Sequence, residues 1–290
     1  MAVKLSGFAD EIDDNFENQL KGLKENGIGH IEVRGVNARS IHALSKEDLS
    51  DAIKLLGIYS VKVSSIGSPI GKIKITDDFE AHLKAFENVM AAALAMGTRY
   101  IRIFSFFIPN GEYARYRTET MHRLETLLER ATKKNLVLCH ENEREIYGES
   151  PELCLDIMQH FGGAMRFIFD PANFVTGGFE TYPDAYNSLS GYIEYMHIKD
   201  ADETGIFPAG FGKGRIKEIL ADLILQKNFE GFLTVEPHLA VFTGIDELEG
   251  EGKKNTLVKN KYRTKPEAFA AAAAALKNIL NDIYGAKTFY

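Results

Sequence analysis

The chain has 290 residues, of which 45% are hydrophobic and 26% charged, and its formal net charge is −7. This is the composition of an ordinary globular protein, long enough for one large α/β barrel or two smaller domains. The acidic balance disfavours a nucleic-acid partner, whose phosphates attract basic surfaces. No apolar run approaches the length of a membrane span, and the N-terminal MAVKLSGFADEI lacks the pattern of a signal peptide. With only two cysteines and no disulfide framework, a cytoplasmic location is expected.

Short apolar runs of strand length alternate with longer segments of helical period along the chain. The expected strands are residues 3–8, 28–34, 59–66, 99–105, 136–141, 166–170, 193–198 and 231–236. The expected helices are residues 13–26, 45–56, 76–96, 115–134, 151–161, 182–190, 213–227 and 265–284. Helix start signals stand at Ser45 and at Ser150, and Gly57 follows the second helical segment as a stop signal. Eight such units predict a single (β/α)₈ TIM barrel over residues 1–290.

An open doubly wound sheet is the alternative to a closed barrel. Such a sheet usually carries a phosphate-binding loop after its first strand, whereas this chain reads GFADEIDD there, without GxGxxG or GxxxxGK[ST]. The longest irregular segment, residues 239–264, is expected to cover an active site or to contact another subunit, with a surface loop as the alternative.

Four predicted strands carry, at or near their ends, a side chain of a type that commonly binds metal ions. They are Glu141 in LVLCHEN, Asp170 in FIFDPAN, His197 in YMHIKD and Glu236 in LTVEPH. Their separations of 29, 27 and 39 residues each fit one crossover between parallel strands, and consecutive barrel strands end at the same rim. Singly, each residue could be a hydrogen-bonded core group or a helix cap. Together, three carboxylates and an imidazole predict a site for one divalent cation at the C-terminal rim.

These pieces resemble the xylose-isomerase-like barrel superfamily of sugar isomerases, epimerases and inosose dehydratases. The resemblance covers essentially the whole chain and is also carried by IEVR at 31–34, SSIGSPIGK at 64–72, HEN at 140–142, MHIKDA at 196–201 and VEPHL at 235–239. It implies that Glu141, Asp170, His197 and Glu236 bind a single metal ion and that the two glutamates also act as the acid–base pair. It further implies a homo-oligomer, although the sequence predicts no interface.

Moving a proton between adjacent carbons of a hydroxy-ketone requires a cation at the carbonyl, a base and an acid. We therefore predict an isomerase or epimerase that acts on a small ketose or related polyol-ketone through an enediolate. Mn²⁺ is the expected metal, and Mg²⁺, Co²⁺ or Zn²⁺ can replace it because all four accept these ligands.

Three further residues are predicted to bind the substrate. His238 and Lys199 share strand parity with Glu236 and His197, so all four side chains should point the same way. For His238 and Lys199 the alternative is a structural hydrogen bond or salt bridge. Arg34, at the end of the second strand, either reaches the substrate or pairs with Glu32, and we favour that pair slightly. Glu143 shares parity with Glu141 and is the alternative metal ligand.

Three other functions compete with this prediction. A three-zinc endonuclease of the same superfamily needs additional histidines, but the third and fourth strands end in SSIGSP and FSFF, and Asn173 stands where those nucleases carry a histidine. An inosose-type dehydratase begins with the same proton abstraction and stays open. A non-catalytic sugar-binding barrel is the third alternative. The absence of tryptophan separates the chain from xylose isomerase itself, whose sugar pocket a tryptophan shapes.

Overall fold

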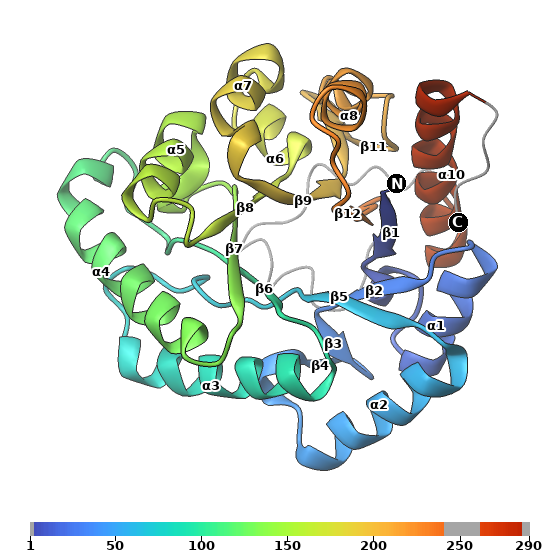
Figure 1. Cartoon of the computed structure of the whole chain (residues 1–290), viewed down its shortest axis with the longest axis horizontal. Helices are drawn as coiled ribbons and strands as arrows, with labels where there is room; N and C mark the ends of the chain where they lie inside the picture. The colour runs from blue at the N-terminus through green and yellow to red at the C-terminus, as the bar shows by residue number, and fades with distance from the viewer. Residues whose placement is uncertain (1–2, 241–261, 286–290) are drawn as a thin grey trace.

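Eight parallel strands form a ring with helices around its outside (Figure 1). The computed structural model describes residues 3–240 and 262–285. The strands are β1 (Lys4–Gly7), β2 (His30–Val33), β5 (Lys62–Ile66), β6 (Tyr100–Ile103), β7 (Val137–Glu141), β8 (Arg166–Phe169), β9 (Ile193–Ile198) and β12 (Phe232–Val235). The hydrogen-bonded order runs β1-β12-β9-β8-β7-β6-β5-β2, so the first strand pairs with the last and the barrel is nearly closed. The predicted TIM barrel is confirmed.

The helices follow the strands in chain order, as the colour gradient around the ring shows (Figure 1). They are α1 (Phe16–Glu25), α2 (Lys46–Tyr59), α3 (Phe79–Ala95), α4 (Tyr113–Thr132), α5 (Pro151–His160), α6 (Pro171–Thr176), α7 (Tyr186–Leu189), α8 (Ile216–Leu225) and α10 (Lys265–Tyr284). Two small hairpins, β3–β4 (Gly35–Val36 and Arg39–Ser40) and β10–β11 (Asp200–Asp202 and Gly205–Phe207), extend the loops at the rim. In the described part of the chain, no helix is long and apolar enough to cross a bilayer.

The predicted helix starts are confirmed, whereas one predicted stop is wrong. Ser45 caps α2, and Ser150 caps α5. However, α2 continues past Gly57, and Ser60 adopts the left-handed conformation with φ of 52°. The last turn persists because the Tyr59 hydroxyl donates to Glu17 on α1 and ties the two helices together.

One further segment differs from the predicted secondary structure, and another lies mostly outside the described residues. The short helix α6 begins directly after β8, where no helix was predicted; the reason is the cap that Asp170 provides. Most of residues 239–264, predicted to cover the site or to contact a subunit, lies outside the described residues, which stop at 240 and resume at 262.

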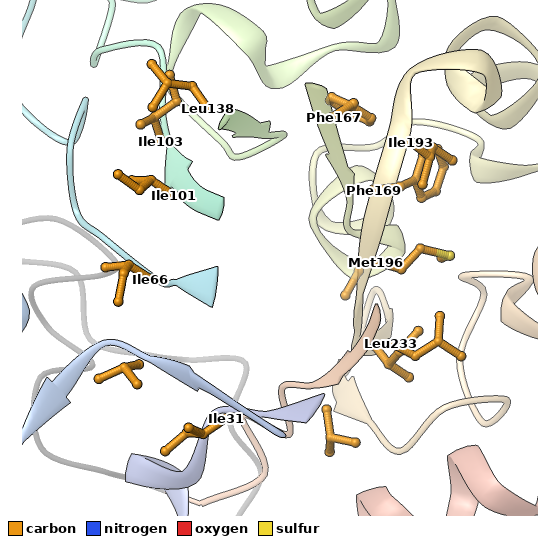
Figure 2. Close-up of a cluster of buried hydrophobic side chains, with 14 of the residues drawn as sticks. Ile31, Ile66, Ile101, Ile103, Leu138, Phe167, Phe169, Ile193, Met196 and Leu233 are labelled. Atoms are coloured by element: carbon orange, nitrogen blue, oxygen red, sulfur yellow. The ribbon is translucent and has the colours of Figure 1, made fainter. Parts of the chain in front are cut away.

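The two faces of each strand have separate roles. Outward side chains pack beneath the helices, as Figure 2 shows for Ile31, Ile66, Ile101, Leu138, Phe167, Met196 and Leu233. Inward side chains fill the barrel, and Cys139, Ile168 and Tyr195 form its apolar lower layer. Because side chains alternate along a strand, the next inward positions on the same strands lie at the C-terminal rim.

Candidate metal centre

The ends of β7, β8, β9 and β12 bring the four predicted metal ligands together. Each of Glu141, Asp170, His197 and Glu236 offers one ligand atom, and the four atoms lie within 4.8 Å of one another. None of the four residues is more than 2% exposed. Three carboxylates in such a dry site need compensating positive charge nearby, whether from side chains or from a bound cation.

Asp170 is held in place through its backbone by Asn142, the residue after Glu141. The Asn142 side chain donates to the Asp170 carbonyl at 2.9 Å and accepts from the Asp170 amide at 3.0 Å. The Oδ1 atom of Asp170 caps α6 by accepting from the Asn173 amide at 3.0 Å. The Asn173 side chain donates to the Asn142 carbonyl, so it serves this network at the position where the endonucleases carry a histidine ligand. Asp170 is therefore both a helix cap and a member of the cluster.

His197 faces the cluster with one ring nitrogen and a buried carboxylate with the other. Its Nδ1 lies 2.8 Å from Glu141 Oε1 and 3.3 Å from Glu236 Oε2, while its Nε2 lies 3.2 Å from Glu32 Oε2. Burial lowers the pKa of His197, but these three carboxylates outweigh burial and raise it well above its ordinary value. A carboxylate on the far nitrogen is the usual device for orienting a metal-binding imidazole.

Arg102 of β6 supports Glu141 from the opposite side. Its Nη1 donates to Glu141 Oε2 at 3.2 Å, and its Nη2 donates to the Gly67 carbonyl at 3.0 Å. Burial raises the pKa of Glu141, but the charges of His197 and Arg102 outweigh it and bring that pKa to about 2. Sequence reasoning missed both Arg102 and Glu32, although both lie at inward-facing positions of their strands.

Lys199 bridges two of the carboxylates. Its Nζ lies 2.9 Å from Asp170 Oδ2 and 3.4 Å from Glu236 Oε2, and the residue is buried. Burial raises the pKa of Asp170 to about 6, with a further increase from Glu236 and Glu141 that Lys199 opposes. Burial also raises the pKa of Glu236, but Lys199, His197 and His238 outweigh it and hold the pKa well below its usual range. Lys199 and His238 therefore both lie against the cluster, as strand parity predicts.

Arg34 and His238 meet at the other oxygen of Glu236. Arg34 Nη1 lies 3.2 Å and His238 Nε2 3.3 Å from Glu236 Oε1. Arg34 also pairs with Asp10 at 2.8 Å and with Glu11 at 2.9 Å. The favoured pairing of Arg34 with Glu32 is therefore wrong, because Glu32 lies one inward position deeper in β2 and bonds to His197.

Glu143, the alternative ligand, lies outside the four-residue cluster. Its Oε2 pairs with Lys72 Nζ at 3.1 Å, and Lys72 lies over the Phe104 ring at 4.5 Å. Lys72 follows Gly71, whose φ is +92°, and a Cβ there would lie 2.0 Å from the Phe104 carbonyl oxygen. The glycines of SSIGSPIGK therefore form a sharp turn against β6, and the turn holds Arg102 through the Gly67 carbonyl.

The donor set fits one divalent cation. Three carboxylates and an imidazole give the mixed oxygen and nitrogen donors that borderline divalent ions accept, and three of the four residues have a fixed partner behind them. Glu32 supports His197, Arg102 supports Glu141, and Asn142 supports Asp170. Such support is expected where ligands are held in place for a metal.

The comparisons with known proteins agree with this architecture. A family model described as xylose isomerase-like TIM barrel matches residues 20–256. No curated protein sequence matches the chain.

Three solved structures share the fold over nearly the whole chain. A D-allulose 3-epimerase from Methylomonas sp., in complex with D-allulose, has a TM-score of 0.72 at 14% identity over 95% of this chain and 96% of its own. The probable 3-DHS dehydratase from Bacillus anthracis has a TM-score of 0.72 at 16% identity over 95% and 99%. The IOLI protein with a zinc atom has a TM-score of 0.74 at 14% identity over 98% and 100%. At these identities the likeness establishes the fold.

Proposed function

Because the chain belongs to the xylose isomerase-like TIM barrel family, we propose that it is a divalent-metal-dependent isomerase or epimerase of a small ketose or related polyol-ketone. The reaction removes a proton from a carbon beside the carbonyl, passes through an enediolate intermediate and returns a proton to carbon. The observation that carries the proposal is the buried cluster of three carboxylates and one imidazole at the C-terminal rim. The D-allulose bound to the Methylomonas epimerase supports a sugar as substrate.

Glu141, Asp170, His197 and Glu236 are assigned to one divalent ion, with Mn²⁺ as the metal and Mg²⁺, Co²⁺ or Zn²⁺ as substitutes. When bound, such an ion polarises a carbonyl and stabilises developing negative charge. The zinc atom in the IOLI protein supports a divalent ion in a barrel of this fold.

The proton transfers are assigned to Glu141 and Glu236. Adjacent cations weaken a carboxylate as a base, so each glutamate accepts a proton only when a neighbouring cation turns away from it. Beside Glu141, Arg102 also donates to the Gly67 carbonyl, so this cation turns away less readily than the cation beside Glu236. Beside Glu236, in contrast, the flexible Lys199 can exchange its ion pair for a bond to the substrate.

Lys199, His238 and Arg34 are assigned to substrate oxygens. All three lie within 3.4 Å of a Glu236 oxygen, so a substrate that reaches Glu236 also reaches their N–H groups. Arg34 has most of its donors engaged by Asp10, Glu11 and Glu236, so its share in substrate binding is the smallest.

A dehydratase is the second candidate, because elimination of water beside a carbonyl starts from the same proton abstraction. Its support is the likeness in fold to the probable 3-DHS dehydratase. The protonated Lys199, buried beside Asp170, is a group able to donate a proton to a departing hydroxyl.

The decisive experiment is solvent-deuterium incorporation, followed by mass spectrometry and NMR, with a panel of ketoses and inososes. Deuterium at a carbon beside the carbonyl with Mn²⁺-loaded protein, lost in the metal-stripped protein and in Glu236→Gln, is the expected result. A loss of 18 mass units, one water, identifies the dehydratase. Binding of a sugar with neither exchange nor elimination contradicts both reactions and indicates a sugar-binding barrel.

We also propose that residues 1–290 form a single domain, that the protein assembles as a homo-oligomer in the cytoplasm, and that it has no nucleic-acid partner. Light scattering after size-exclusion chromatography tests the assembly. A monomer at micromolar concentration contradicts it.

A further inference from the structure

A second group of ligand-like atoms lies beside the first and shares Glu236 with it. Glu11, Glu236 and His238 each offer one atom, the three atoms lie within 4.8 Å of one another, and all three residues are buried. Glu11 belongs to the helical turn after β1, and its Oε2 accepts from the His238 amide at 2.7 Å. Two carboxylates and an imidazole are donors that a divalent cation accepts.

A permanent cation already occupies this second group. The Arg34 guanidinium lies 2.9 Å from Glu11 Oε1 and 3.2 Å from Glu236 Oε1. These are the same two oxygens that face His238 Nε2, at 3.5 Å and 3.3 Å. The guanidinium is thus bonded to two of the donor atoms of the group, and it cannot lose its proton to make room for a metal ion.

The position of Arg34 is fixed from two further directions. Asp10 accepts from its Nε at 2.8 Å and from its Nη2 at 2.9 Å, a bidentate pair. The Phe8 ring lies 4.1 Å from its guanidinium carbon, and the same ring contacts His197 edge-on. The charge therefore cannot move out of the group without breaking several buried contacts.

We infer that Arg34 takes the place of a second metal ion, so that the protein binds one divalent ion, and that replacing Arg34 by a neutral residue opens a second metal site made by Glu11, Glu236 and His238. The inference rests on the metal centre of the proposed function. It also limits how the proposed enzyme holds its substrate. A pair of metal ions clamps two substrate oxygens, whereas here one of the two positions offers N–H donors instead.

The test is the number of Mn²⁺ ions bound per chain, measured by elemental analysis and isothermal titration calorimetry on the full-length protein. The wild type is expected to bind one ion, Arg34→Gln two and the double variant Arg34→Gln/His238→Ala one. The conservative variant Arg34→Lys keeps the charge and is expected to bind one. Mn²⁺ electron paramagnetic resonance adds a readout independent of turnover, because two ions sharing Glu236 show a spin-coupled spectrum.

The outcomes separate this inference from the proposed function. A folded Arg34→Gln that binds one ion overturns the inference and leaves the metal centre intact. A wild type that binds two ions also overturns it, and this measurement serves even if the variants do not fold. A wild type that binds none removes the metal centre itself, and the proposed function fails with it.

Discussion

The two ends of the barrel interior are built from the same strands but have opposite chemistry. At the C-terminal rim, carboxylates and cations are almost entirely buried in a connected network of ion pairs. At the N-terminal end, Cys139, Ile168 and Tyr195 form an apolar layer. Below that layer, among the residues that the structure describes, ion pairs are partly exposed, such as Arg166 with Glu194, whose side chains are 29% and 21% accessible.

Only two positions along a strand separate these environments. On β7 Cys139 precedes Glu141, and on β9 Tyr195 precedes His197, so one inward position is roughly 7 Å from the next. Burying apolar groups stabilises the fold, whereas burying charges costs free energy unless each is paired. The lower layer therefore stabilises the barrel, and the rim holds charges in place at the expense of stability.

The largest expected difference between the ends is in turnover. Glu141→Gln removes the proposed metal ligand and proton acceptor, so we expect the rate of solvent-deuterium exchange to fall by about 10²–10⁴-fold. The matched control is Glu194→Gln, the same change at the N-terminal end, where the side chain bonds to Tyr100 and Arg166. Equal losses in both variants would mean that the substitution acts through folding.

Buried and exposed ion pairs should also differ in their effect on stability. Arg102→Met leaves the carboxylate of Glu141 buried without its guanidinium, and we expect a loss of about 3–5 kcal/mol in the free energy of unfolding. Arg166→Met breaks a partly exposed pair and should cost less than about 1 kcal/mol. Urea titration of the metal-free proteins measures both. Similar values for the two variants would contradict the contrast between the ends.

The sequence predicts that these four side chains lie together because period-two alternation and strand ends are local signals. Glu141, Asp170 and Glu236 follow an apolar run, His197 is the next-to-last residue of one, and closure of the barrel brings the four side chains together. The groups that support them carry no such signal. Glu32 and His197 are 165 residues apart, and their contact exists only across the closed barrel.

Arg34 is a residue whose direction can be predicted from the sequence but whose partners cannot. Its inward position follows from strand parity, but its partners Asp10 and Glu11 lie in the turn after β1, where no periodicity indicates a direction. The sequence therefore predicts that Arg34 faces the site but not which carboxylates it meets. The short helix α6 was not predicted because it also lacks a periodic pattern: it depends on a cap and not on a long apolar run.

Stability should depend on pH through His82, which supports the rim from α3. Its Nε2 accepts from the Gly71 amide at 2.8 Å, and burial lowers the pKa of His82 from 6.5 to about 4. Between these values the unfolded chain binds more protons than the folded one, so stability falls as the pH falls from about 6.5 to 4. His82→Gln keeps an acceptor that does not titrate and should lose less stability between pH 7.5 and 5 in urea titrations. An unchanged pH dependence would exclude His82 as its source.

The smallest effect is expected from a change confined to the lower layer. Ile168 is the inward position before Asp170 on β8 and pairs in register with Tyr195 on β9, so it lies directly beneath the four-residue cluster. Ile168→Val removes one buried methylene and should cost about 0.5–1.5 kcal/mol of unfolding free energy. If the two layers are independent, Mn²⁺ affinity and deuterium exchange should stay at their wild-type values while the urea midpoint falls. A weakened Mn²⁺ affinity in this variant would mean that the ligands are positioned by packing from below as well as by Glu32, Arg102 and Asn142, because no polar group is altered.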